Sequence, residues 1–199
     1  MKNLILTLAL AVVTTVGANA QEVVEVTNCC TSTTTFENTK GDLTFNEMVS
    51  QTEVAAKEIT KTASFYESTS TKKLNEVKSV FRGEGSTTIE VVCTSKGNVI
   101  SVVIDSPFME DEVIQLPVKM LLESAEQLLL DAGYGTGVEG VADWSIVVLR
   151  RPLGPDFTFA LYIFTTSKGY VSVNTVTGEV SPAGLEGCPC PFTDPCICP

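Results

Sequence analysis

The most chemically specific feature of this 199-residue sequence is a group of four cysteines close to its C-terminus. They alternate with prolines in the segment Cys188-Pro-Cys190-Pro-Phe-Thr-Asp-Pro-Cys196-Ile-Cys198-Pro. Two thiolates in a C-x-C step can bind one soft ion, so the group could complete a four-sulfur shell around Zn(II) or a smaller one around Cu(I). The same thiols could instead pair as disulfides. The residues therefore predict either a metal site or a disulfide-linked tail.

Residues 1–20 have the features of a secretory signal peptide. Lys2 supplies the positive start, Leu4 to Val16 is an almost unbroken apolar run, and Ala18-Asn19-Ala20 is a small-x-small cleavage pattern. We expect a mature chain that begins at Gln21 and is secreted or periplasmic. No later segment is long and apolar enough to span a bilayer.

This compartment favours disulfides, because exported dithiols are usually oxidised. The favoured interpretation therefore has no cofactor, and Zn or Cu bound by the four C-terminal cysteines is the alternative. Cys93 lies beside Val91 and Val92 in an apolar run, so it is expected either as a small buried residue or as the partner of a terminal cysteine. The disulfide candidates are the six cysteines outside the predicted core: Cys29, Cys30, Cys188, Cys190, Cys196 and Cys198.

Composition excludes several classes of function. The sequence contains no histidine, which rules out Ser-His-Asp and Cys-His catalysis and every histidine-ligated metal site. Loss of residues 1–20 would remove Lys2 and no acidic residue, leaving 12 Lys and Arg against 24 Asp and Glu, a net charge of −12. A chain of that charge repels phosphate backbones, so we predict no nucleic-acid partner.

Two further motifs could carry chemistry but stand in the wrong context. Asp105 and Glu110-Asp111-Glu112 lie in a polar connection without an apolar pocket, which predicts a solvated acidic loop rather than a pair of catalytic carboxylates. Gly135-Thr-Gly137-Val-Glu-Gly140 matches the dinucleotide fingerprint, yet it follows a helical pattern and precedes a strand pattern, the reverse of what pyrophosphate binding needs. No catalytic or cofactor-binding residue is predicted.

The elements that position these residues follow from hydrophobic spacing. Helical spacing from Phe45 to Phe81 predicts one long broken helix or two in succession. Thr87 to Thr94 and Asn98 to Asp105 then read as a β-hairpin around Ser95-Lys96-Gly97. A second helix is predicted from Pro117 to Ala132, where Gly133 ends it. Three more strands are expected: Trp144–Leu149, Phe157–Thr166 and Tyr170–Val176.

The predicted fold class is α+β, built from two helix-plus-antiparallel-hairpin units with a cysteine-rich irregular C-terminal tail. The predicted parts are a signal peptide (1–20), a Thr/Cys-rich irregular segment (21–42), an α+β domain (43–181, with possible subunits 43–106 and 107–181) and a Cys/Pro-rich tail (182–199). Thr94-Ser-Lys-Gly97 recurs as Thr166-Ser-Lys-Gly169, which indicates either an internal duplication or convergence on one turn.

The segment Gly169-Tyr-Val-Ser-Val-Asn-Thr-Val-Thr-Gly-Glu-Val180 closes the second unit. With the helix before it, residues 117–180 resemble a PepSY-like extracytoplasmic module, in which strands follow a helix and the last strand has such an ending. The resemblance implies a small secreted or periplasmic module that inhibits or binds other proteins, and it assigns no functional residue.

Together these features predict a non-catalytic binding or interaction module that is secreted or periplasmic and stabilised by disulfides. Its partner would be another protein or a component of the cell envelope. The alternative is a thiolate metal-binding protein that uses the C-terminal cysteines.

The disulfide interpretation makes a direct prediction about thiol content. Protein purified from its native compartment should have no more than one free thiol, that of Cys93, because the terminal cysteines would be oxidised. Thiol titration and mass spectrometry, with and without reduction, would check this. Stoichiometric zinc or copper whose removal exposes four titratable thiols would contradict it and favour the metal-binding alternative.

Overall fold

The computed structural model describes residues 42–108, 111–155 and 157–183. These residues form two helices and eight strands, and each helix is followed by four strands. The bounds are α1 (Phe45–Ile59), β1 (Ser64–Thr71), β2 (Glu76–Arg82), β3 (Thr88–Thr94), β4 (Val99–Ile104), α2 (Leu122–Asp131), β5 (Ile146–Arg150), β6 (Leu161–Thr166), β7 (Gly169–Asn174) and β8 (Val180–Pro182).

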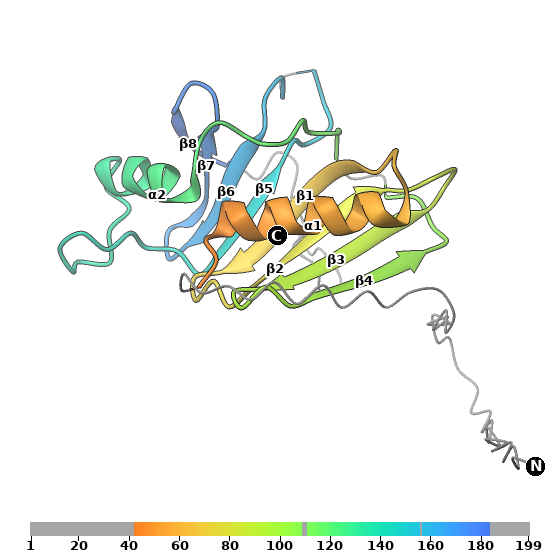
Figure 1. Cartoon of the computed structure of the whole chain (residues 1–199). Coiled ribbons are helices and arrows are strands. Elements are labelled where there is room, and N and C mark those ends of the chain that lie inside the picture. The colour runs from red at the N-terminus through yellow and green to blue at the C-terminus, as the bar shows by residue number, and fades with distance from the viewer. Residues whose placement is uncertain (1–41, 109–110, 156, 184–199) are drawn as a thin grey trace, which may run out of the picture. The chain divides into compact units, whose positions relative to one another are not determined.

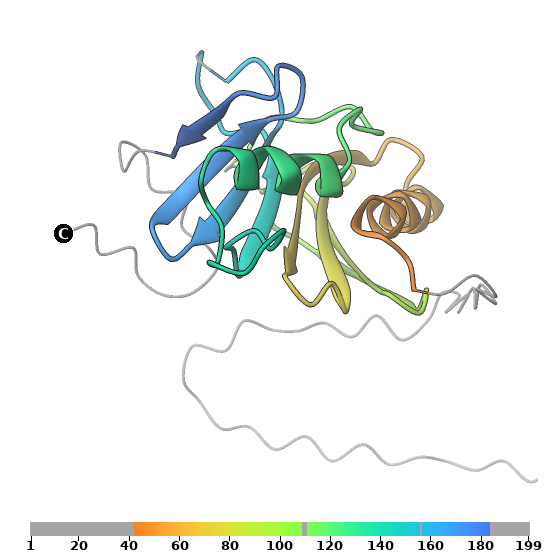
Figure 2. The same ribbon diagram turned by 90° about the vertical axis from the view of Figure 1, so that its left-hand side faces the viewer.

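All eight strands belong to one antiparallel sheet with the order β4-β3-β2-β1-β5-β6-β7-β8. Both helices pack on the same face of it, α1 over the β1–β4 half and α2 over the β5–β8 half (Figures 1 and 2). The prediction of two helix-plus-hairpin units is therefore wrong. Each half is a helix with a four-stranded meander, and pairing of β1 with β5 makes the two meanders a single sheet.

The predicted long helix ends at Ile59, and the remainder of its stretch forms β1 and β2. A β-bulge between Phe65 and Glu67 adds a residue to β1, so Phe65 and Ser68 face the helix side at a spacing of three. In β2 the inward position between Val77 and Phe81 is a serine, so the apolar residues alone recur every four. The buried serine therefore leaves β2 with an apolar spacing that imitates a helix, and the bulge interrupts the alternation that would mark β1 as a strand.

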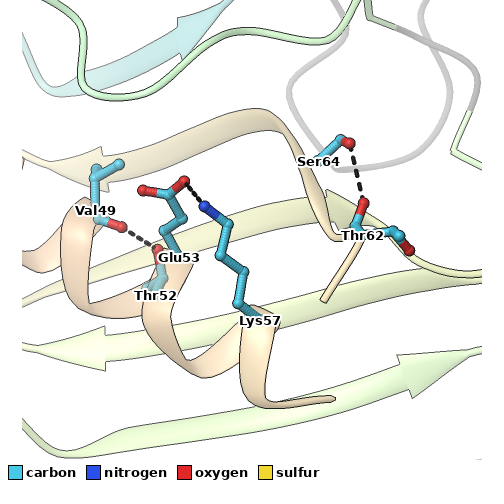
Figure 3. A network of polar contacts seen from close by, with 6 residues as sticks. All are labelled: Val49, Thr52, Glu53, Lys57, Thr62 and Ser64. Carbon is cyan, nitrogen blue, oxygen red and sulfur yellow. Dashed lines mark hydrogen bonds and ion pairs between the residues drawn. The ribbon is translucent and has the colours of Figure 1, made fainter. Parts of the chain in front are cut away.

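Helix α1 begins where its sequence dictates. Thr44 and Glu47 form a capping box, in which the Thr44 N–H donates to the Glu47 carboxylate (2.8 Å) and the Glu47 N–H donates to Thr44 Oγ1 (3.3 Å). Lys57 and Glu53 form an ion pair (2.6 Å) on the solvent side of the helix (Figure 3). Such exposed pairs contribute little, about 0.3–0.5 kcal/mol, so packing of the buried face holds the helix in place.

The buried face of α1 carries one polar residue, and the sheet satisfies it. The Thr52 hydroxyl donates to the Val49 carbonyl (2.7 Å; Figure 3). Its oxygen also lies 2.7 Å from the Ser79 hydroxyl, which lies 2.6 Å from that of Ser68. All three hydroxyls are buried, so this chain of contacts fixes α1 at one position over β1 and β2.

Asn46 joins the two halves of the fold on the helix side. Its side-chain amide donates to the Tyr162 hydroxyl (3.1 Å), and its carbonyl oxygen accepts from the N–H of Leu122 (3.0 Å). Leu121, the N-cap of α2, makes no side-chain cap, so Asn46 on α1 satisfies a donor that α2 leaves open. The Tyr162 hydroxyl donates in turn to the Met120 carbonyl (3.0 Å). Burial raises the pKa of Tyr162 to about 12, so it remains a donor at neutral pH.

Other boundaries refine the sequence expectations. The β3–β4 hairpin is present, and Gly97 takes the positive φ (83°) that its turn requires. Helix α2 starts at Leu122 rather than Pro117, and Gly133 follows its end with φ 89°. The repeated Thr-Ser-Lys-Gly sequence joins β3 to β4 but β6 to β7. Because these turns hold different places in the two halves, the repeat marks a shared turn rather than equivalent positions of a duplication.

The β6–β7 turn provides a test of this backbone. Gly169 has φ 109° and an added Cβ would meet nothing within 4 Å, so Gly169→Val should act through backbone strain alone. We expect a loss of about 1–2 kcal/mol in the free energy of unfolding, measured in urea. As a control, Thr165→Val places the same side chain in the adjacent strand and should change stability by less than about 0.5 kcal/mol. Equal effects of the two variants would contradict the turn assignment.

Candidate functional site

The most distinctive surface of the described chain is the outer strand β4, at one edge of the sheet. Its sequence is Val-Ile-Ser-Val-Val-Ile, five β-branched apolar residues and one serine. None of its six residues is buried, and Ile100 is 68% exposed while Val102 and Val103 are each 46% exposed. Isolated exposed apolar residues are ordinary, but a whole strand of them is not.

The backbone of β4 is oriented by its pairing with β3. The N–H of Thr94 donates to the carbonyl of Asn98 (2.9 Å), which fixes where the antiparallel alternation begins. Residues that bond the neighbouring strand then alternate with residues whose N–H and C=O point away. The outward groups of β4 therefore belong to Val99, Ser101 and Val103. Among the described residues, no strand or isolated bridge pairs with this edge.

The two edges of the sheet differ in a way that bears on function. Edge strands can pair with other chains, and proteins usually protect them with short length, charges, bulges or proline. The edge formed by β8 is protected, since it has three residues and ends in Pro182, which has no N–H. The edge formed by β4 is twice as long and has no charge, no proline and no bulge. It therefore has the properties of a strand that accepts another strand.

No residue of β4 is charged. The charged residues around it lie beyond its two ends and on the neighbouring strands. Before its first residue, Lys96 forms an exposed ion pair with Asp42, and after its last residue comes exposed Asp105. On the sheet face opposite the helices, Lys78 and Glu90 form an ion pair (2.8 Å) across β2 and β3. A strand arriving at β4 would thus meet apolar side chains flanked by charges of both signs.

A second surface feature is a shallow hollow of about 210 Å³ between α2 and the loop before β5. Its lining includes Lys72, Glu126 and Val141. The Trp144 indole N–H donates to Glu126 (2.6 Å), and the Lys72 ammonium donates to the Ala142 carbonyl while lying 5.6 Å from the Trp144 ring centroid. These polar groups bond within the protein, so the contacts at the hollow connect α2 to the loop before β5. Trp144 is itself a residue of the hydrophobic core, 4% exposed.

The acidic connection after β4 forms only in part the solvated loop that its sequence predicts. Asp105 and Glu112 are exposed, and Glu110 lies outside the described residues. Asp111, however, is 5% exposed and binds buried Arg150 at 2.5 Å and 2.7 Å, to Nη2 and Nε. The expectation of a solvated loop is wrong for Asp111, because a bridge to Pro152 draws it against the start of the β5–β6 connection. The pair links this segment to the sheet.

The glycine-rich motif Gly135–Gly140 lies in the loop between α2 and β5, as its context indicates. Gly135 forms a bridge with Ala142, and Gly137 and Gly140 have φ values of 88° and 72°. No helix follows it in the described chain before β5, so no helix N-terminus is available for a phosphate here.

Of the seven cysteines, the structure describes only Cys93, which is a buried free thiol of β3. Burial raises its pKa to about 11, so the thiol is protonated at neutral pH and a poor nucleophile. The candidates Cys29, Cys30, Cys188, Cys190, Cys196 and Cys198 lie outside the described residues. Within residues 42–108, 111–155 and 157–183, no group of three or more Cys, Asp or Glu is placed to hold a metal ion.

Sequence reasoning located β4 but missed its significance. An uninterrupted run of β-branched residues is typical of a strand buried on both faces. The hairpin signal shows that this run pairs with β3. It does not show whether another strand pairs with the other side of the run.

Comparison of the chain with protein families, with characterised proteins and with solved structures gives no match. The similarity of residues 117–180 to PepSY-like modules therefore stays an expectation from the sequence. None of the described helices is long and apolar enough to cross a membrane.

Near the hollow, Asp143 gives a prediction about pH. The Ser167 hydroxyl and the Ser167 N–H (3.0 Å) both donate to Asp143 Oδ2. These bonds, with the hydroxyl having the larger effect, hold the pKa of this carboxyl below its usual value. A lowered native pKa stabilises the fold above the unfolded-state pKa, and that stabilisation is lost as pH falls through the native pKa. Ser167→Ala should raise the pKa of Asp143 in a carboxyl NMR titration. Ser172→Ala, a distant serine of β7, should leave it unchanged, and an unmoved pKa in Ser167→Ala would contradict the assignment.

Proposed function

We propose that this protein is a non-catalytic interaction module that binds its partner by adding a strand to the outer edge of β4. One observation carries the proposal: β4 is a long apolar edge with outward backbone groups at Val99, Ser101 and Val103, and nothing in the described part of the chain gives it the usual protection. In this mode of recognition, main-chain hydrogen bonds provide affinity and alternate side chains provide selectivity.

The rest of the described structure supports a rigid platform for such binding. The strand β3 that carries β4 is held under α1, with Ile89, Val91 and Cys93 buried in the core. An incoming strand would therefore meet an edge whose position is already fixed, which lowers the entropic cost of association.

Export and disulfides belong to this proposal on sequence grounds alone. The signal-peptide features of residues 1–20 favour a secreted or periplasmic compartment for the module. The cysteines at both ends of the chain would then act as covalent staples around the sheet domain. The partner would be another protein, or a component of the cell envelope that presents an extended segment.

A proline at Ser101 gives the sharpest test of strand addition. The N–H of Ser101 points away from β3, so Ser101→Pro would remove an outward donor while retaining the donors that bind β3. The probe is a short fluorescent peptide of alternating threonine and valine, followed by anisotropy. We expect the full-length protein to bind it, and Ser101→Pro to weaken binding by about tenfold, the effect of losing roughly 1.4 kcal/mol with one hydrogen bond.

Ser101→Ala is the matched control, since it loses the hydroxyl and retains the N–H. It should bind the peptide as the unaltered protein does, and all three proteins should have the same circular dichroism spectrum. Equal binding by the proline variant, or no binding of any extended peptide, would contradict strand addition at β4.

A further inference from the structure

The identity of the added strand can be inferred from β4 itself, on the basis of the proposed function. Two antiparallel strands form hydrogen bonds between residues whose backbone N–H and C=O groups face each other. On β4 these are the odd-numbered residues, so two copies of β4 can pair only odd with odd. The register that pairs the largest number of these outward-facing residues sets Ser101 opposite Ser101 and Val99 opposite Val103.

This register also matches the side chains. On the face opposite the helices it sets Ile100 of each copy against Val102 of the other, the first 68% exposed and the second 46% exposed. On the helix side, Val103, also 46% exposed, would contact Val99. Cross-strand pairs of β-branched residues stabilise a sheet by about 0.2–1 kcal/mol each, and each of these apolar groups thus gains an apolar neighbour.

Charge favours the antiparallel orientation. No residue of β4 is charged, and the nearest charges beyond its two ends have opposite signs, Lys96 before it and Asp105 after it. An antiparallel pair sets the start of one strand beside the end of the other, so lysine approaches aspartate. A parallel pair would instead bring Lys96 near Lys96 and Asp105 near Asp105. The Lys96 side chain is 71% exposed, so it can approach both Asp42 of its own chain and the carboxylate of the other copy.

We propose that the partner strand is β4 of a second copy, and that two copies form one continuous sheet about a two-fold axis beside Ser101. The contact is a single strand edge, well below the roughly 1,600 Å² of a standard interface, so association should depend on concentration. The net charge of −11 on each chain opposes it, and salt should therefore strengthen it.

Sedimentation equilibrium of the full chain over a wide range of concentration tests this inference, with reductant added so that cysteine cross-links cannot hold copies together. We expect a monomer–dimer equilibrium that Ser101→Pro shifts to monomer and Ser101→Ala leaves unchanged. A dimer that persists in Ser101→Pro would place the interface elsewhere and overturn the inference.

A charge-exchange pair tests the register without altering the backbone. The double variants I100K/V102K and I100E/V102E substitute exposed side chains, so each should fold. In the proposed register each variant alone opposes like charges and should be monomeric, whereas an equal mixture should form a heterodimer. A mixture that remains monomeric would contradict this register.

Hydrogen exchange separates failure of this inference from failure of the proposed function. If the protein is monomeric and the outward amides of Val99, Ser101 and Val103 exchange rapidly, the second copy is excluded, while binding of the threonine–valine peptide would still support strand addition. If it is monomeric and those amides are protected, a segment of the same chain occupies the edge, and both proposals fail.

Discussion

The antiparallel pairing of β1 with β5 is the constraint on which the rest of this structure depends. Four residues of each strand pair, from Ser68 with Leu149 to Thr71 with Ile146. Without this ladder each half would be a helix on a separate four-stranded sheet, with two edges of its own. With it, β1 and β5 become central strands, and β4 and β8 are the edges of the sheet that the described residues form. The pairing thereby decides which backbone groups can meet another chain.

Polar contacts fix the two halves at this ladder, one set on each side of the sheet. On the helix side, Asn46 bonds both Tyr162 and the start of α2. On the opposite side, Arg150 follows the last β5 residue in the ladder and binds Asp111 in a buried pair. Buried ion pairs contribute little net stability, because desolvation offsets their attraction, but removal of one partner is costly. Their effect here is to specify how the chain crosses from β4 to β5.

The sheet is consequently asymmetric in what it offers to other molecules. Its β8 end is closed by length and by Pro182, whereas its β4 end presents apolar side chains together with outward backbone groups. Cys93, the cysteine that the structure describes, lies in the neighbouring strand β3 opposite Val99, where burial raises the pKa of its thiol. Strand addition would use the apolar side chains and outward backbone groups that this surface presents.

The sequence alone determined the local features whose causes are local. The capping of α1 by Thr44 and Glu47, the β3–β4 hairpin with its positive-φ glycine and the end of α2 at Gly133 all follow from short-range chemistry. Tertiary structure decided what depends on distant residues. Buried Ser79 gave β2 an apolar spacing typical of a helix and the bulge interrupted the alternation of β1, and only pairing in the sheet and packing against α1 show both as strands. Likewise, β4 has the composition of a buried strand, and it is exposed because it ends the β1–β4 meander and no described strand pairs with its outer side.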